Sequence, residues 1–218
     1  DAAALAEIML SLQSRGAHNI NLVTAAPHSH IMADSIISAR EMGLAIPIVY
    51  NTNSYETVEA LRALDGLVDV YLPDLKYTSS AAAARHSGTA DYFTYAAPAI
   101  MEMQRQAGML CVGEDGLARR GMIIRHLVLP GSVGEARSVL RFIADNLPRE
   151  TYISLMGQYY PCYKAEDYPP LDRRLLQREY DRAVDYAISL GLEHVFIQAL
   201  DSAVSEYTPN FKKFMNKL

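Results

Sequence analysis

The sequence predicts an α/β protein folded as a partial, open (β/α)6-type parallel barrel, that is, an incomplete TIM barrel. Helical and strand patterns alternate along the chain and the strands are nearly all apolar, which is typical of a parallel sheet covered by helices. About six strands can be recognised, spaced by about 25 residues early in the chain, whereas a complete eight-unit barrel takes roughly 250 residues. No linker or change of composition divides the chain, so we expect residues 1–218 to form a single domain.

Each element is predicted from the period of its apolar residues. Short apolar runs predict strands over 19–24, 45–51, 68–76, 122–131, 151–156 and 194–199. Helical spacing predicts helices over 3–16, 31–43, 54–66, 91–108, 133–147 and 172–191. We expect Ser54 to cap the third helix, Pro98 to interrupt the fourth, and 109–121 to form a hairpin that turns at Asp115 and Gly116. The Tyr- and Pro-rich segment 157–170 has no regular period and is predicted to be a loop.

Composition argues against several classes of function. The net charge is −5, with 20 basic and 25 acidic residues and no basic cluster, so we expect no nucleic-acid or membrane partner and favour small-molecule chemistry. No apolar run approaches the roughly 20 residues that cross a bilayer, and the start of the chain lacks the features of a signal peptide, so we expect a cytoplasmic protein. Cys111 and Cys162 match no metal-ligand or redox spacing and are expected to be reduced thiols with a structural or incidental role.

The stretch VDVYLPDLKY, residues 68–77, ends a buried strand in charges. Because strand side chains alternate, Val70, Leu72, Asp74 and Lys76 share one face of the sheet. Ligands of parallel barrels bind at the carboxyl ends of the strands, and a partly buried Asp and Lys must be paired or bound to offset their desolvation. Asp74 and Lys76 therefore predict a binding site, although they can equally form a structural ion pair.

Polar residues at other predicted strand ends are candidates for the same site. They are Asn51, Thr52 and Asn53, then Arg125 and His126, then Gln158, Tyr159 and Tyr160. Arg125 and His126 are adjacent in a strand and point to opposite faces, so at most one of them faces the barrel mouth. The residues 51–53 can also be turn and cap residues for the following helix.

In order, these segments resemble radical S-adenosylmethionine proteins, specifically the group similar to pyruvate formate-lyase activating enzymes. In that group a strand ending in D-T-N-G is followed by one ending in L-D-L-K and then by an R-x-x-x-P-G strand. This chain has N-T-N-S at 51–54, P-D-L-K at 73–76 and R-H-L-V-L-P-G at 125–131. The resemblance covers residues 2 to 190 approximately, and it is the ordered set rather than any one motif that is specific.

The resemblance implies a partial (β/α)6 barrel, bound S-adenosylmethionine and a [4Fe-4S] cluster. Such enzymes cleave S-adenosylmethionine reductively to a 5′-deoxyadenosyl radical that abstracts hydrogen, often from a glycine of a partner enzyme. Asp74 and Lys76 would then meet the amino-acid or ribose part of the cofactor, and Asn51, Thr52 and Asp74 would lie where the family can hold a cation. The other implied cofactor-binding residues are Arg125, Gln158 and Tyr159. The implied partners are this small-molecule cofactor and a glycyl-radical enzyme or another protein substrate.

Two family motifs are absent. The cluster of the family is held by C-x-x-x-C-x-x-C, and three thiolates are needed, whereas this chain has two separated cysteines. VTAAPHSH stands where the family has G-G-E. Because the chain starts at Asp1 within a predicted helix, we expect a fragment that lacks a first strand and the cysteine loop, with the cluster ligands upstream of residue 1. Such a fragment would be inactive alone, and its open sheet edge would favour self-association.

Two alternatives remain open at this point. His28 and His30 follow a strand, and His126, His194 and Asp201 come later, as in metal-dependent hydrolases of the amidohydrolase type. That chemistry needs His126 and His194 at strand ends, where neither is predicted to lie. The other alternative is a degenerate barrel that only binds a ligand or partner.

Overall fold

The computed structural model describes residues 1–198 and 200, in which one sheet organises the chain. Six parallel strands follow the order β1-β2-β3-β5-β6-β7, and β4 pairs antiparallel with β5. Their bounds are β1 Ile20–Val23, β2 Ile48–Thr52, β3 Val70–Pro73, β4 Cys111–Val112, β5 Ala118–Leu127, β6 Tyr152–Met156 and β7 Val195–Ile197. Among the described residues β1 and β7 are the two ends of the sheet, so the predicted open, partial parallel barrel is confirmed.

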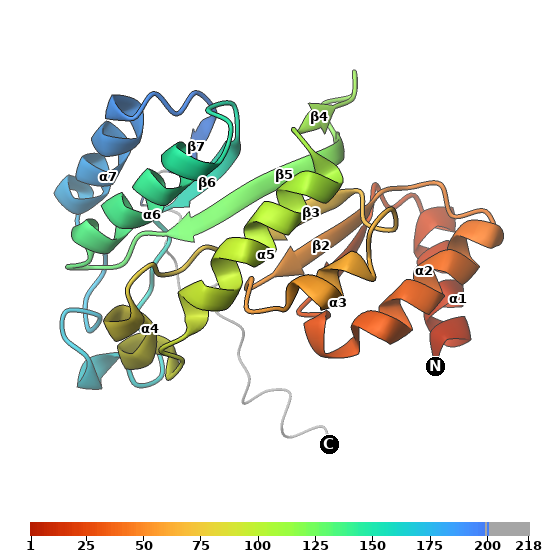
Figure 1. The fold of residues 1–218 in the computed structure, drawn as a ribbon, viewed down its shortest axis with the longest axis horizontal. Coiled ribbons are helices and arrows are strands. Elements are labelled where there is room, and N and C mark those ends of the chain that lie inside the picture. Colours follow the sequence, from red (N-terminus) through yellow and green to blue (C-terminus); the bar gives the residue numbers. More distant parts are fainter. Residues whose placement is uncertain (199, 201–218) are drawn as a thin grey trace.

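Helices cover one face of this sheet. They are α1 Ala2–Ser14, α2 Ser29–Glu41, α3 Val58–Arg62, α4 Ser80–Ser87, α5 Tyr92–Ala107, α6 Val133–Asn146 and α7 Gln177–Ser189, with short 3-10 turns η1 Ala26–His28 and η2 Ala165–Asp167. Figure 1 shows α3, α5 and α6 lying across the sheet, with α1 beside α2 and α6 beside α7. The main hydrophobic core lies between these helices and the strands, and includes the fully buried Tyr50, Tyr71 and Ile100.

The pairing of β3 with its neighbours decides which side chains meet. Tyr71 pairs with Tyr50 of β2 and faces the helices, where its hydroxyl donates to Gln106 Oε1 of α5 at 2.5 Å. Successive residues alternate, so Leu72 and Asp74 face the opposite side. Beyond the end of β3, Asp74 forms a parallel bridge with Arg125, which brings two charged residues to the same level. The predicted alternation along 68–77 is confirmed.

The hairpin predicted at Asp115 and Gly116 is also confirmed, at the amino end of β5. Cys111 pairs with Arg120, and Gly113 N donates to Leu117 O at 2.8 Å. Gly121 has a φ of +122°, and a Cβ there would lie 2.4 Å from Leu110 Cα, so the close approach of the two chains requires glycine.

The prediction that Ser54 caps a helix over 54–66 is wrong. Thr57 is the N-cap, its side chain accepts from Ala60 N, and α3 spans only Val58–Arg62. Ser54 is instead buried with a φ of +65°, because Thr52 Oγ1 accepts from its N–H at 3.0 Å and turns the chain sharply after β2. A side-chain acceptor two residues upstream thus competes with helix formation.

Three other helices differ from the prediction. Pro98 does not interrupt α5, because the helix is anchored on both sides of it by the fully buried Ala96 and Met103. The helix α4 was not predicted, since its alanine-rich sequence shows no apolar period, yet Ser79 caps it and Gly88 ends it at a φ of +69°. The last helix begins at Gln177 rather than at 172, since Glu179 binds the preceding loop.

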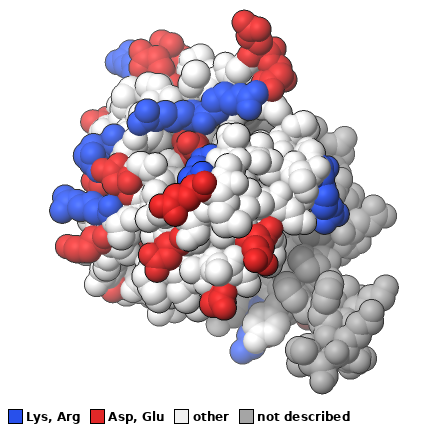
Figure 2. Space-filling view, turned by 90° about the vertical axis from the view of Figure 1, so that its right-hand side faces the viewer, with Lys and Arg blue, Asp and Glu red and all other residues white. Residues whose placement is uncertain are grey.

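Figure 2 shows the face at the α1 and α2 end, where acidic and basic side chains are interspersed among uncharged ones. In the described part of the chain, no helix combines the length and the apolar character that crossing a membrane requires.

Candidate functional site

A cavity of about 220 Å³ opens on the sheet face opposite the main helix layer, at the carboxyl ends of β3, β5 and β6. We call it the interior cavity. It is lined by Asp74, Lys76, Tyr77, Arg125, Leu127, Leu129, Met156 and Gln158. Its apolar lining is Leu127 at the end of β5, Leu129 just after it and Met156 at the end of β6. Arg125 lies two residues before Leu127, on the same face of β5. Four of the residues predicted for the site, at 74, 76, 125 and 158, are thus brought together.

Asp74 is the centre of the charged group. Lys76 Nζ donates to Asp74 Oδ2 at 2.7 Å, and Arg125 Nη2 lies 2.7 Å from Asp74 Oδ1. Arg125 Nη2 also donates to Asn51 Oδ1 at 2.6 Å, which places a fifth predicted residue at the edge of the cavity. One carboxylate is therefore shared between two cations, so the group carries one surplus positive charge.

Two atoms of this group lack hydrogen-bond partners within the described residues. Arg125 Nε and Asp74 Oδ1 are both buried and neither makes a well-aligned hydrogen bond, although Oδ1 is ion-paired to Arg125. A buried polar atom without a partner costs free energy, and such atoms are rare in folded proteins. The ion pair with Arg125 Nη2 stabilises Asp74 Oδ1, so Arg125 Nε is the buried atom of this group that has no polar partner among the described residues.

Tyr92 positions the strand ends and was not predicted from the sequence. Its hydroxyl oxygen accepts from Lys76 N at 3.1 Å and lies 2.9 Å from Asn53 O and 2.8 Å from Asp74 O. One hydroxyl from α5 thus joins the ends of β2 and β3. Burial raises the pKa of Tyr92, so the hydroxyl keeps its proton for one of these carbonyls. The local sequence around Tyr92 does not predict these hydrogen bonds, because the partners are 16 to 39 residues away in the chain.

Thr52 points away from the interior cavity. Its hydroxyl is bonded to Glu56, whose other oxygen accepts from Tyr50 Oη at 2.8 Å, and all three side chains are buried on the helix side of β2. Burial raises the pKa of the Glu56 carboxyl, although the hydrogen bonds from Thr52 and Tyr50 oppose this. The hydroxyl predicted to contact the cofactor or a cation is thus engaged in a buried cluster that sequence analysis missed.

Tyr159 and His126 also lie outside the interior cavity. Tyr159 donates to Leu171 O at 2.7 Å and lines a different hollow over the loop 157–170. His126 is buried, its Nδ1 lies 2.7 Å from Leu75 O, and its Nε2 has no partner among the described residues. Burial lowers its pKa, so His126 is a neutral core residue on the face opposite Arg125, as the strand alternation predicts.

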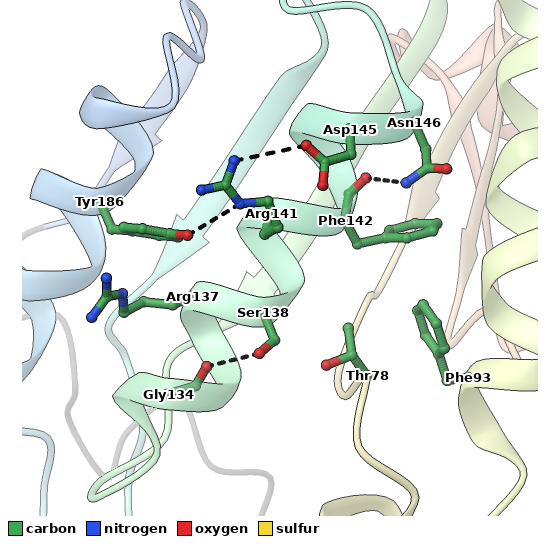
Figure 3. Close-up of a pocket in the computed structure, with 10 residues that line it drawn as sticks. All are labelled: Thr78, Phe93, Gly134, Arg137, Ser138, Arg141, Phe142, Asp145, Asn146 and Tyr186. Carbon is green, nitrogen blue, oxygen red and sulfur yellow. Dashed lines mark hydrogen bonds and ion pairs between the residues drawn. The ribbon is translucent and has the colours of Figure 1, made fainter.

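A larger hollow of about 600 Å³ lies in the outer helical layer, between α5, α6 and α7. Figure 3 shows Arg141, Asp145 and Tyr186 on its rim, with Phe93 and Phe142 on one side. Arg141 Nε donates to Tyr186 Oη at 3.3 Å. Because this hollow lies among the helices and none of its lining residues belongs to a strand, its volume does not make it the candidate site.

The geometry gives no support to a hydrolase site. Across residues 1–198 and 200, no three His, Cys, Asp or Glu side chains are grouped so that they could hold a metal ion. His28 ends η1 and His30 lies in the first turn of α2, whereas His194 stacks on Tyr152 with ring centroids 4.4 Å apart. Asp201 lies outside the described residues.

Comparisons with known proteins place the fold beside one type of enzyme. A solved domain of a pyruvate-formate lyase-activating enzyme from Bacteroides vulgatus is similar with a TM-score of 0.58. The two share 14% sequence identity, over 83% of this chain and 98% of that chain. The likeness is one of fold. It agrees with the parallel, open sheet.

One sequence relative is longer than this chain, and its own activity is uncharacterized. An uncharacterized protein of Methanocaldococcus jannaschii is 32% identical over 180 residues, which are 82% of this chain and 48% of that protein. The chain therefore spans about half the length of this curated relative. No protein-family model matches the sequence.

Proposed function

We propose that this chain is the cofactor-binding part of a radical S-adenosylmethionine enzyme similar to pyruvate formate-lyase activating enzymes. Its interior cavity would bind the amino-acid and ribose portion of S-adenosylmethionine. The observation that carries the proposal is the charged group formed by Asp74, Lys76, Arg125 and Asn51 at the strand ends. Its buried Arg125 Nε has no hydrogen-bond partner among the described residues. The likeness of fold to an activating-enzyme domain supports it.

The chemistry of the residues fits this cofactor. The surplus positive charge of Lys76 and Arg125 suits the carboxylate of the amino-acid portion, and Asp74 can accept from its ammonium group. Gln158 supplies a neutral amide for ribose hydroxyls. The cavity, at about 220 Å³, is smaller than the roughly 300 Å³ at which pockets for whole ligands begin, so it suits one end of the cofactor rather than all of it.

The residues of this chain do not fit the iron–sulfur cluster of such enzymes. Three thiolates are needed, and the 218 residues contain Cys111 and Cys162. Cys111 pairs with Arg120, five residues along β5 from Arg125 and thus roughly 17 Å from it. A cluster at this site would need ligands from outside these residues. Bound S-adenosylmethionine would supply a hydrogen-abstracting radical only with such a cluster, while the residues of this chain would bind and orient the cofactor.

Equilibrium dialysis of the chain with labelled S-adenosylmethionine tests the proposal. We expect saturable binding that Asp74→Asn weakens by about tenfold, because the neutral amide loses a charge-assisted bond to the ammonium group. Arg125→Lys should weaken binding similarly, since lysine cannot reach Asp74 and the ligand at once.

Two matched variants serve as controls. Asp145→Asn and Arg141→Lys make the same chemical changes at exposed positions of α6 in the outer layer, and both should leave binding unchanged. Loss of binding in these controls, or full binding by Asp74→Asn, would contradict the assignment of the cavity. An absence of any binding by the folded chain at millimolar cofactor would contradict the proposed function itself.

A further inference from the structure

A second hollow lies beside the interior cavity, between α4 and the loop 157–170. We call it the tyrosine pocket. Its volume is about 530 Å³. It is lined by Ala84, Arg85, His86, Gly88, Tyr159, Tyr160, Cys162, Tyr163, Lys164, Ala165, Tyr168 and Leu171. Arg85 Nη2 donates to Pro169 O at 2.9 Å, which joins α4 to the loop and holds the two sides of the pocket together. Figure 1 shows the ribbon of α4 beside this loop.

The tyrosine pocket and the interior cavity share a wall. Gln158 lines the interior cavity, while the next residue, Tyr159, lines the tyrosine pocket. Tyr77 also lines the interior cavity, and its ring lies against that of His86 in the tyrosine pocket, with centroids 6.0 Å apart. Ser87 Oγ donates to Tyr77 Oη at 3.3 Å and fixes this ring. A ligand in the tyrosine pocket would thus be one side chain away from the charged group around Asp74.

Aromatic rings make up much of the lining. Four tyrosines, at 159, 160, 163 and 168, surround the pocket, and Tyr163 exposes 91% of its surface although it is a large aromatic residue. Tyrosine rings offer flat apolar faces together with hydroxyl groups, and they pair with other rings in stacked or edge-on arrangements. A planar ring is the ligand shape that such walls fit best.

The charged residues among the described lining of the pocket are both positive, although the carboxylates of Asp172 and Glu135 lie near enough to Tyr159 and His86 to act on them electrostatically. Arg85 and Lys164 line the pocket, and none of its described lining residues is Asp or Glu. The nearby acidic residues Glu166 and Asp167 follow Ala165 in η2 but do not line it. His86 Nδ1 is in addition buried without a hydrogen-bond partner in the described structure. In a chain of net charge −5, a pocket with two cations and no carboxylate complements an anion.

We propose that the tyrosine pocket binds a small planar aromatic anion, a ring that carries a carboxylate or phosphate group. The ring stacks among the tyrosines and the anionic group meets Arg85 and Lys164. The shared wall identifies this ligand as the substrate of the neighbouring cavity, and that assignment, unlike binding itself, rests on the function proposed above. On this assignment, the molecule that donates hydrogen to the radical is a small molecule rather than a protein.

Binding is tested with 2-naphthoate as the probe, by isothermal titration calorimetry and saturation-transfer NMR on the whole chain. Two further probes separate the contributions. The neutral 2-naphthamide has the same ring without the charge, and cyclohexanecarboxylate has the charge without an aromatic ring. We expect 2-naphthoate to bind at least tenfold more tightly than either, because each lacks one of the two groups that the pocket complements.

Variants locate the bound probe. Lys164→Gln should weaken 2-naphthoate by about tenfold and leave 2-naphthamide nearly unchanged, because it removes the charged contact with the ligand and, within the protein, only the stacking of the ammonium group 5.5 Å over the Tyr163 ring. Arg85→Gln should do the same, but it also removes the bond to Pro169, so Lys164→Gln is the variant that separates charge from loop structure. Arg15→Gln, at the exposed end of α1, is the matched control and should change neither affinity.

The outcomes are distinct from those of the cofactor test. Equal affinity for 2-naphthoate and 2-naphthamide, or 2-naphthoate binding that survives both Arg85→Gln and Lys164→Gln, overturns the proposal while the cofactor assignment stands. Binding of 2-naphthoate that follows the expected pattern in a chain that binds no S-adenosylmethionine supports the pocket and contradicts the proposed function.

Discussion

Tyr92 shows how one residue can fix the geometry of a site without facing it. Its hydroxyl holds Asn53 O, Asp74 O and Lys76 N together, so the ends of β2 and β3 depend on a group contributed by α5. Asp74 and Lys76 could otherwise separate, since the Asp74 carboxylate is held by Lys76 and Arg125, and the Lys76 side chain by Asp74 alone among the described residues. The charged group is therefore a product of the packing of a helix as well as of the strand itself.

Tyr92→Phe should lower the free energy of unfolding by about 1–2 kcal/mol, because a buried amide and a buried carbonyl lose their partner. Cofactor affinity should fall with it, as the strand ends become free to move. Urea unfolding monitored by circular dichroism measures the first effect. Tyr55→Phe, which removes a hydroxyl bonded to Asp91 at 3.1 Å on the surface, is the control and should change the free energy of unfolding little. Equal losses in the two variants would contradict the role assigned to Tyr92.

Glu56 should make the free energy of unfolding depend on pH. Burial raises its pKa above the ordinary value of 4.5, so above that pH the folded state holds a proton that the unfolded state has released. The stabilisation from this protonated carboxyl is thus complete below pH 4.5 and is lost as the pH rises through the folded pKa. Glu56→Gln, which keeps an acceptor without an ionisable group, should show a flatter profile.

The comparison is made by urea unfolding at several pH values between 4 and 8. The stability of the wild type relative to Glu56→Gln should decrease as the pH rises above 4.5 and should level off once the pH passes the folded pKa of Glu56. Glu59→Gln lies three residues along, exposed in the first turn of α3, and should follow the wild-type profile. A constant difference between the wild type and Glu56→Gln across the range would show that Glu56 is ionised in the folded state.

At the scale of secondary-structure elements, the sequence predicted what local periodicity determines. The strand 68–76 was recognisable with its charged end because the alternation of Val70, Leu72 and Asp74 is local. The starts of α3 and α7 were misplaced because each depends on a side chain bonded to a loop, Thr52 in one case and Glu179 in the other. The helix α4 was missed because an alanine run has helix propensity but no apolar period.

The residues of the candidate site also fall into those that the local sequence predicts and those that depend on distant contacts. Asp74, Lys76, Arg125 and Gln158 were predictable, since a residue at the carboxyl end of a parallel strand must reach the mouth of the sheet. Tyr92 was not, because its contacts join elements far apart in sequence. Thr52 lies on the helix side of β2, away from the interior cavity, and the reason is related. Its neighbour Asn51 faces the cavity, so strand alternation turns Thr52 toward Glu56, which the motif alone could not indicate.

Glu179 should determine where α7 begins. Its carboxylate accepts two bonds from Arg173 at 2.8 Å, one from Gly131 N at 2.9 Å and one from Leu176 N at 3.0 Å. The Arg173 bonds are the main reason that its pKa falls to about 2. Since Arg173 is 38% exposed, water screens part of this interaction, and Glu179→Gln should cost about 2 kcal/mol of unfolding free energy at pH 7.

This cost should itself depend on pH. A lowered pKa gives a stabilisation that is complete above the ordinary value of 4.5 and is lost as the pH falls toward 2. Wild type and Glu179→Gln should therefore converge in that range in thermal or urea unfolding. Glu150→Gln changes an exposed glutamate after α6 and should match the wild type throughout. A difference that persists at pH 2 would mean that Glu179 acts through packing rather than charge.

At the scale of the whole molecule, the open sheet has a consequence for association. Within the described residues β1 pairs only with β2, so its other edge presents unpaired backbone groups. Natural sheets protect such edges with charged residues, but β1 reads Ile-Asn-Leu-Val and Val23 is 62% exposed. An uncharged edge of this kind is a template for pairing with a second copy of the chain.

We therefore expect the 218-residue chain to self-associate as its concentration rises, and Val23→Lys to reduce this association by placing a charge on the edge. Sedimentation velocity over a range of concentrations measures both. Ile188→Lys makes the same change at a residue of α7 that is 66% exposed, and should leave the association unchanged because a helix face offers no backbone pairing. If both variants reduce association equally, exposed apolar surface in general is responsible; if the wild type sediments as a monomer at every concentration, the edge of β1 does not pair in solution.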